Sequence, residues 1–170
     1  MDSAVVVTGG SRGIGAAVAL QAAGSGHDVA VSYRSRSDAA EAVVARCRAL
    51  GRRAVAVRAD VASEPDVVRL FETVDRELGA IGALVANAGI VAPPSRVDGL
   101  TAERVERLLA VNVTGTLLCA REAVRRLSTR YGGAGGSIVL VSSAAARHGG
   151  AGEYVDYAAT KGAVDTIAVG

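Results

Sequence analysis

Short apolar segments rich in Val and Ala recur along the chain, and longer segments with a helical spacing of apolar residues separate them. Each short segment is apolar almost throughout instead of alternating with polar residues, which is typical of parallel strands covered on both faces. The pattern therefore predicts five strands, at Ala4–Thr8, Asp28–Tyr33, Ala54–Arg58, Ala83–Ala86 and Ser137–Ser142.

The intervening segments predict helices, because their apolar residues return every three or four positions. These helices span Gly13–Ala23, Asp38–Leu50, Glu64–Leu78, Thr101–Leu109, Asn112–Tyr131 and a last segment from Val155 onward. Regular alternation of strands and helices implies right-handed crossovers between neighbouring parallel strands. The predicted fold class is therefore α/β, with a doubly wound, Rossmann-like parallel sheet.

The C-terminal end differs from that of a complete sheet of this kind. A Rossmann sheet has six strands, whereas five are predicted here, and the sequence ends at Gly170 inside the last predicted helix. The fifth strand would then be an uncovered edge of a sheet that is normally buried. We expect the C-terminal part of the domain to be missing.

Composition and charge narrow the function classes. Net charge is only +2 and the arginines are interspersed with acids, which argues against nucleic acid as a partner. The sequence has no long apolar run for a membrane span and no room for a signal peptide before the first strand. Cys47 and Cys119 are isolated, and with only His27 and His148 elsewhere they make no metal-ligand spacing. We expect a cytoplasmic protein with reduced cysteines and no metal.

A glycine-rich turn lies between the first strand and the first helix. Gly9 allows a tight turn out of the strand, and Gly13 and Gly15 let backbone approach a diphosphate and the sheet. Phosphates would then bind the free N–H groups at the start of the helix. The turn predicts one dinucleotide-binding domain over residues 1–170, with a turn that serves packing alone as the alternative. The predicted binding residues here are Gly9, Ser11, Arg12, Gly13, Ile14 and Gly15.

The end of the second strand indicates which dinucleotide is bound. It reads Ser32-Tyr33-Arg34 and has no acid before Asp38, although a site that prefers NAD usually has one there for the ribose hydroxyl. Arg34 and Arg12 instead favour a 2′-phosphate. We predict that NADP(H) is preferred over NAD(H); the alternative is that Arg34 is a solvated surface charge.

The sequence contains a single lysine, Lys161, and eighteen arginines. Its ammonium is a compact point charge, unlike the wide planar guanidinium, which suggests a task that arginine cannot perform. Tyr157 precedes it by four residues, so a helix would place both on one face. The pair is the best candidate for chemistry.

These features together resemble the short-chain dehydrogenase/reductase family, and the resemblance covers the entire chain. Its commonest form combines a Thr-Gly-x-x-x-Gly-x-Gly turn with Tyr-x-x-x-Lys, as here. Further matches follow in order at the strand ends and in one helix: Asp60-Val61, Asn87-Ala88-Gly89, Asn112 and Ser142-Ser143. The resemblance implies an NADP-dependent oxidoreductase that interconverts a small-molecule ketone and a secondary alcohol.

The resemblance also implies a role for each matched residue. Tyr157 would be the general acid in ketone reduction and the base in alcohol oxidation, and Lys161 would also hold the nicotinamide ribose. Ser143 would bind the substrate carbonyl oxygen, while Asn112 would bend its helix and support a proton-relay water. The remaining matches would line the cofactor cleft: Asp60, Val61, Asn87, Ala88 and Gly89.

Several alternatives stay open. Ser142 competes with Ser143, Asn112 could simply cap a helix, and Tyr154, which has no lysine four residues on, is expected at the pocket rim. A homo-oligomer is expected, since the helices from Asn112 and Val155 form a dimer face in many relatives. The alternative function is a non-catalytic nucleotide-binding or scaffold protein, because the substrate segment of the family would lie beyond Gly170.

Overall fold

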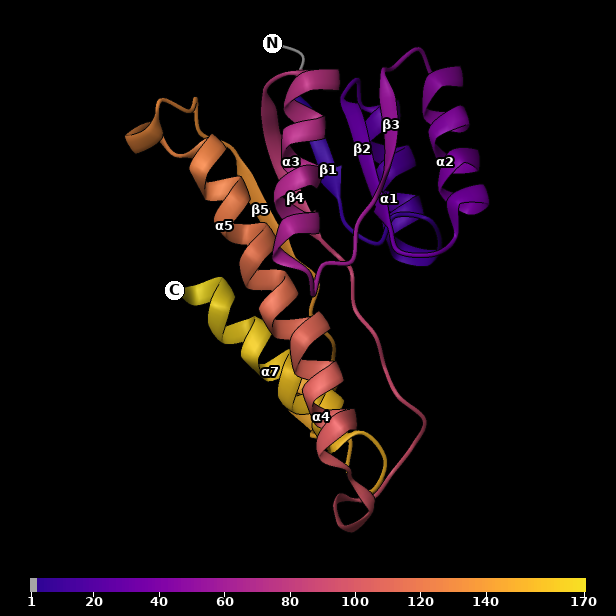
Figure 1. Cartoon of the computed structure of the whole chain (residues 1–170), viewed down its shortest axis with the longest axis vertical. Helices are drawn as coiled ribbons and strands as arrows, with labels where there is room; N and C mark the ends of the chain where they lie inside the picture. Colours follow the sequence, from indigo (N-terminus) through magenta and orange to yellow (C-terminus); the bar gives the residue numbers. More distant parts are fainter. Residues whose placement is uncertain (1–2) are drawn as a thin grey trace.

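The computed structural model describes residues 3–170 and contains one sheet of five parallel strands (Figure 1). The strand order is β3-β2-β1-β4-β5, so the chain winds outward from β1 first in one direction and then in the other. This order confirms the predicted doubly wound α/β sheet, whose ligand crevice is expected beyond the carboxyl ends of β1 and β4. The strands are β1 (Ala4–Val7), β2 (Asp28–Tyr33), β3 (Ala54–Arg58), β4 (Ile81–Ala86) and β5 (Ser137–Leu140).

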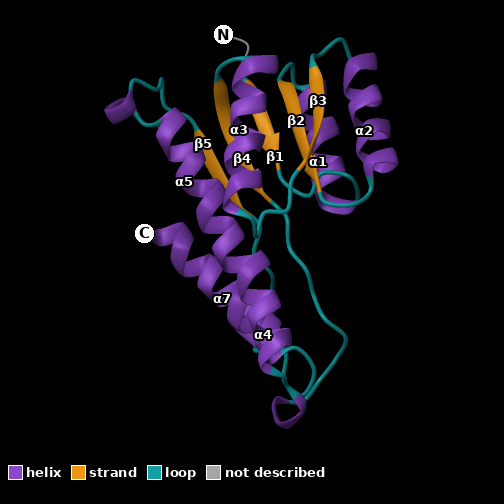
Figure 2. Ribbon diagram, viewed as in Figure 1, coloured by secondary structure: helices purple, strands orange, loops and turns teal. Residues whose placement is uncertain are grey.

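Helices cover the two faces of the sheet and create two apolar cores (Figure 2). Because side chains alternate along a strand, Val5 and Val7 pack toward α1 and α2, while Ala4 and Val6 pack toward α3 and α5. The covering helices are α1 (Gly13–Gly24), α2 (Ser37–Ala49), α3 (Glu64–Leu78) and α5 (Gly115–Leu127).

The remaining helices extend beyond the carboxyl ends of the strands, where α4 lies against α7 (Figure 1). The hydroxyl of Thr101 caps α4 by accepting the Arg104 N–H at 3.3 Å. These helices are α4 (Ala102–Leu109), α6 (Ala145–His148) and α7 (Val155–Val169), with a short 3-10 turn, η1 (Val97–Gly99), before α4.

The single helix predicted over Asn112–Tyr131 is wrong at both ends. A π-helical turn, η2 (Ala110–Thr114), joins α4 to α5, so Asn112 lies inside a continuous helical stretch and not at its start. At the other end Ser128 is extended, with φ −67° and ψ 132°, and a 3-10 turn, η3 (Thr129–Tyr131), follows. The strands predicted to end at Thr8 and Ser142 end earlier, at Val7 and Leu140. In the fifth strand Val141 N–H still donates to Ala86 O at 3.1 Å, but Val141 O accepts a hydrogen bond from Lys161 of α7 in place of a strand partner.

Candidate active site

A cleft of about 640 Å³ opens at the carboxyl ends of β1 to β4. Most of the residues predicted to bind a cofactor line it: Gly9, Ser11, Arg12, Gly13, Ile14, Arg34, Asp60, Val61, Asn87, Ala88 and Gly89. Gly15, Tyr157 and Lys161 are not among its lining residues. The sequence reasoning missed others, namely Ser32, Tyr33, Ser35, Arg36, Ala59, Ile90 and Val111.

Close backbone packing shapes the glycine turn at the floor of this cleft. Gly9 has φ +63°, and a Cβ there would stand 2.9 Å from Ala88 Cα. A Cβ on Gly15 would stand 2.5 Å from Asn87 Nδ2 and 2.6 Å from Gly9 O. Gly15 therefore packs the start of α1 against the turn, and it does not face the cleft.

Hydrogen bonds between Thr8 and Asn87 join this turn to the end of β4. The Thr8 hydroxyl oxygen accepts the N–H groups of Asn87 and Ala88, both at 3.0 Å. Asn87 Nδ2 donates to the carbonyl oxygens of Thr8 at 2.9 Å and Gly9 at 3.1 Å. The Asn87 amide thus holds the wall of the cleft in shape.

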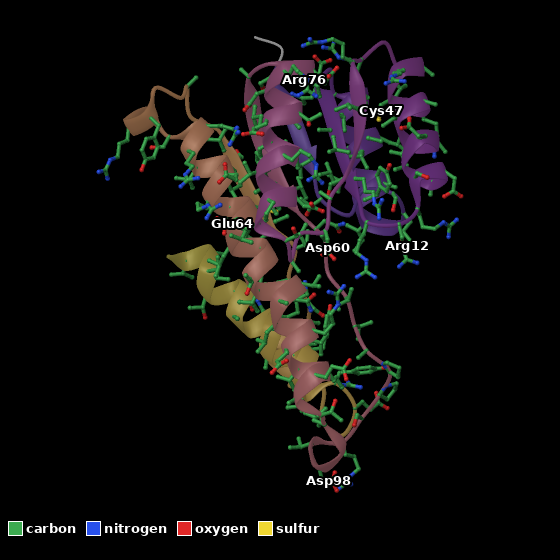
Figure 3. The ribbon with its side chains drawn as sticks, in the orientation of Figure 1. Arg12, Cys47, Asp60, Glu64, Arg76 and Asp98 are labelled. Carbon is green, nitrogen blue, oxygen red and sulfur yellow. The ribbon has the colours of Figure 1, made fainter. Side chains whose placement is uncertain are left out.

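Arginines form one side of the cleft mouth beside the end of β2. Within residues 3–170, the Arg34 side chain makes one long ion pair, 3.9 Å from its Nη1 to Asp60 Oδ2, and Arg36 pairs with Asp38 at 3.3 Å. Asp60 is approached by a second arginine, Arg107, at 3.7 Å. Figure 3 shows Arg12 and Asp60 at this end of the sheet. The mouth of the cleft therefore carries more positive than negative charge.

Asn112 is buried, and its side chain links three elements: the segment after β4, the π turn η2 and α7. Its Oδ1 accepts the Ile90 N–H at 2.8 Å, and its Nδ2 donates to Ile90 O at 2.9 Å and to Thr160 Oγ1 at 3.0 Å. The segment after β4 is thereby fixed to the π turn and to α7. Sequence reasoning missed Thr160, whose place directly before Lys161 is the only local signal for it.

Lys161 lies 5% exposed, and its Nζ donates to Val141 O at 2.6 Å. The same Nζ is 5.8 Å from the ring centroid of Tyr157. Burial lowers the pKa of Lys161, and the charge of Asp165 partly opposes this. A Cβ on Gly89, a lining residue of the cleft, would be 3.7 Å from Nζ, so the ammonium stands directly beside the cleft.

The two candidate serines make different contacts. The Ser142 hydroxyl donates to Lys161 O at 3.2 Å, whereas the Ser143 hydroxyl oxygen accepts the Ala145 N–H at 3.2 Å. Ser143 therefore keeps its hydroxyl proton for another acceptor. Tyr154, expected at the rim, is half-buried at the start of α7 and is not among the residues that line the cleft.

Within residues 3–170, no helix is both long and apolar enough to cross a bilayer. The same part of the chain contains no group of three or more His, Cys, Asp or Glu side chains that could hold a metal ion. Cys47 and Cys119 are buried free thiols, and burial raises the pKa of Cys119 to about 12.

Comparison with known proteins gives a consistent result. The family model for short chain dehydrogenase matches residues 3–169. The chain is 50% identical to the uncharacterized oxidoreductase YgfF of Escherichia coli over 165 residues, 97% of this chain and 67% of that protein. It is 37% identical to versicolorin reductase 1 of Aspergillus parasiticus, over 95% of this chain and 60% of that one.

A solved structure is similar over the same region. It is a short chain dehydrogenase from Burkholderia cenocepacia in complex with NADP, with a TM-score of 0.91, 38% identity, and coverage of 98% of this chain and 66% of the other. The chain thus spans about three fifths to two thirds of the length of these relatives. With fold, motif order and family model in agreement, the chain belongs to the short-chain dehydrogenase family.

Proposed function

We propose that the protein is an NADP-dependent oxidoreductase that interconverts a small-molecule ketone and a secondary alcohol by hydride transfer. The observation that carries this proposal is the position of Lys161, buried between the Tyr157 ring and the glycine-lined cleft. An ammonium and a phenol hydroxyl four residues apart on one helix can act together on one bound ligand.

The described residues fit a dinucleotide. The cleft volume of about 640 Å³ lies in the usual range for ligand sites, and a Cβ on Gly13 would meet nothing within 4 Å, so backbone at the helix start is open to a diphosphate. The turn from Gly9 to Ile14 would hold the diphosphate, and Lys161 the nicotinamide ribose. When bound, the cofactor supplies or accepts the hydride.

The chain's own residues would manage the proton. In reduction, the Tyr157 hydroxyl gives its proton to the carbonyl oxygen as that oxygen gains charge; in alcohol oxidation, the phenolate takes it back. Lys161 has three N–H donors, and Val141 O occupies one of them, which leaves donors for the ribose and the phenolate side. The Ser143 proton orients the substrate oxygen.

The arginine-rich mouth supports the preference for NADP(H). Arg12, Arg34 and Arg36 line it together with Ser32 and Ser35, and guanidinium groups bind phosphate more strongly than a hydroxyl. Titration of the protein with NADPH and with NADH, followed by cofactor fluorescence, tests this. Equal affinity for the two cofactors contradicts the preference.

Replacement of Tyr157 by Phe tests the proposed chemistry. Turnover of a ketone panel, followed at 340 nm, should fall by about 10³-fold, since positioned acid–base catalysis contributes roughly 10²–10⁴-fold, while NADPH affinity stays nearly unchanged. Tyr131→Phe is the matched control, because Tyr131 is 60% exposed in η3. Retained activity in Tyr157→Phe would show that the assigned mechanism is wrong.

A non-catalytic nucleotide-binding or scaffold role is the second candidate. The observation that favours it is that Tyr157 and Lys161 are not among the residues that line the cleft. A thermal shift with NADPH, run beside the ketone assay, separates the two functions. A shift without turnover supports binding alone.

We also propose that the protein folds as one domain, acts in the cytoplasm and self-associates. Leu117 and Val124 lie seven residues apart on one side of α5 and are 49% and 44% exposed, and apolar side chains that gather on one face form the kind of patch that favours association. Light scattering should give a mass above 17.1 kDa, which Leu117→Glu should reduce. A monomer in both proteins contradicts self-association.

A further inference from the structure

Arg104, an arginine outside the family motifs, binds the side chain of Asp156, the residue that precedes Tyr157. Arg104 of α4 donates from Nε to Asp156 Oδ2 at 2.6 Å and from Nη2 to Asp156 Oδ1 at 3.3 Å. The side chains are 16% and 2% exposed. The guanidinium thus meets the carboxylate with both of its parallel donors, which is the strongest geometry for this pair of groups.

The contact continues into the backbone of the catalytic residue. Asp156 Oδ1 also accepts the Tyr157 N–H at 2.8 Å. The first N–H groups of a helix have no partner within it, and Tyr157 lies in the first turn of α7. Asp156 therefore satisfies one of these groups, and Arg104 in turn fixes the carboxylate that does so.

A third donor ties the same arginine to the segment after β4. Arg104 Nη1 donates to Pro93 O at 2.6 Å. Two residues further on, Ser95 N–H donates to Glu153 O at 2.8 Å, just before α7. The segment after β4 is the one whose start Asn112 holds through Ile90. Arg104 therefore sits where α4, this segment and the start of α7 meet.

We propose that Arg104, acting through Asp156, is a positioning residue that fixes the Tyr157 phenol relative to Lys161 and the cleft. This inference rests on the proposed function, since it assigns a role in the same reaction. The hydrogen bond from Arg104 lowers the pKa of Asp156 even though burial opposes this. The carboxylate therefore stays charged at neutral pH and continues to accept the Tyr157 N–H. Displacement of a reacting group by about 1 Å can reduce a rate by about 10²-fold.

The chain offers a matched control in the same region. Arg96 and Asp98 also form an ion pair, at 3.1 Å, but their side chains are 79% and 74% exposed. Asp98 lies at the tip of the segment between β4 and α4, far from the sheet (Figure 3). Exposed pairs of this kind contribute little, so Arg96→Gln should change turnover by less than about twofold.

The kinetic test compares single and double variants. Arg104→Gln and Asp156→Asn should each lower kcat by about 10–100-fold, with NADPH affinity within about twofold of the original. The double variant should lose no more than either single variant, because the two residues act as one unit. Arg104→Lys keeps the charge without the paired donors and should recover part of kcat. Unchanged kcat in Arg104→Gln, or an equal loss of NADPH affinity, would overturn the positioning role.

Amide hydrogen exchange gives a readout that does not depend on turnover. In Arg104→Gln, exchange at Tyr157 and its neighbours in the first turn of α7 should become about tenfold faster, while α3 and α5 keep their protection. An unchanged exchange rate at the Tyr157 amide would contradict the positioning role of Arg104. Absence of turnover in the unmodified protein would instead overturn the proposed function, and exchange would still decide whether Arg104 fixes this turn.

Discussion

The half of the sheet that holds the glycine turn and the half that carries Tyr157 are built in different ways. All four residues of β1 and five of the six in β2 are buried, whereas none of the four in β5 is. Val139 in β5 is 50% exposed, but Val5 and Val7 in β1 are at most 8% exposed. The half with the glycine turn, which we propose binds the nucleotide, is thus a packed core, and the half with Tyr157, which we propose is catalytic, has an open sheet edge within residues 3–170.

The two halves also differ in what shapes their functional residues. The glycine turn of the nucleotide half depends on backbone conformations of neighbouring residues, such as the positive φ of Gly9, and one distant side chain, Asn87, joins it to the end of β4. The catalytic half depends on side chains far apart in the sequence: Asn112 with Thr160, and Arg104 with Asp156. We therefore expect mutations in the first half to act on stability and cofactor binding together, and those in the second to act on turnover more selectively.

Among the variants that test this comparison, Gly15→Ala should have the largest effect on stability, and it lies in the nucleotide half. Its Cβ would stand 2.6 Å from Gly9 O and 2.9 Å from Gly10 Cα, so the helix start must move away from the turn. The free energy of unfolding should fall by about 3 kcal/mol, the upper range for overpacking, and NADPH affinity should fall with it. Chemical denaturation and titration measure both.

Gly13→Ala is the control for that variant. A Cβ on Gly13 would meet nothing within 4 Å, and only its φ of +55° is unfavourable, which costs about 1–2 kcal/mol. If Gly13→Ala destabilises the protein as much as Gly15→Ala, close packing is not what shapes the turn.

Asn112→Ala probes the catalytic half. It leaves the N–H and C=O of Ile90 without their side-chain partner, and one unsatisfied buried group costs roughly 1–3 kcal/mol. We expect a loss of about 2 kcal/mol in stability and a fall of kcat by at least tenfold, with NADPH affinity nearly preserved. If cofactor affinity falls as far as kcat, the two halves are not independent.

Local signals explain how much of this architecture the sequence predicts. The predicted bounds of β2, β3 and α3 agree with the structure, because each element has a distinct apolar pattern and an abrupt polar or glycine boundary. The glycine turn is equally local, since Gly9, Gly13 and Gly15 reveal the backbone that it needs. Most of the predicted cofactor residues therefore line the cleft.

Long-range contacts set the limit of such prediction. The π turn around Asn112 has no composition signal of its own, so the sequence predicts two separate helices there, Thr101–Leu109 and Asn112–Tyr131, where the structure has one continuous helical stretch. Arg104 and Asp156 are 52 residues apart, and the sequence alone gives no reason to distinguish them from ordinary charges on two predicted helices. One signal was present: Asp156 is an acid in the first turn of a predicted helix, where it stabilises the free N–H groups, directly before Tyr157.

Asp28→Asn tests the packed half of the sheet through the pH dependence of the free energy of unfolding. Burial alone would raise the pKa of Asp28, but hydrogen bonds and charge from Arg53, with charge from Arg52, hold it below its usual value. A carboxyl group with a lowered pKa adds stability above its unfolded pKa of about 3.9, and this is lost as pH falls through the folded value.

The expected outcome is a loss of roughly 1.5 kcal/mol at pH 7, within the range for hydrogen bonds to charged groups, and a flatter decline in stability below pH 4. Urea denaturation from pH 7 down to pH 2.5 measures both. Asp98→Asn, in an exposed pair, should leave the profile unchanged. A decline as steep in Asp28→Asn as in the original protein would show that another carboxylate controls acid unfolding.

Arg34→Ser should have the smallest effect and the most specific one. Arg34 lines the cleft, and its side chain pairs, among the described residues, with Asp60 alone, at 3.9 Å, so its removal disturbs little of the fold. NADPH affinity should fall about tenfold, the equivalent of about 1.4 kcal/mol, because one charge-assisted hydrogen bond to the 2′-phosphate is lost, while NADH affinity stays the same.

Arg46→Ser removes an equal charge from the exposed side of α2 and controls for the general field of the protein. If it weakens NADPH binding as much as Arg34→Ser, the preference arises from net charge. If only Arg34→Ser does so, and the loss shrinks at high salt, a single side chain at the end of β2 distinguishes the cofactors. The packed half would then determine which cofactor binds, while the contacts of Arg104 and Asn112 determine how fast it reacts.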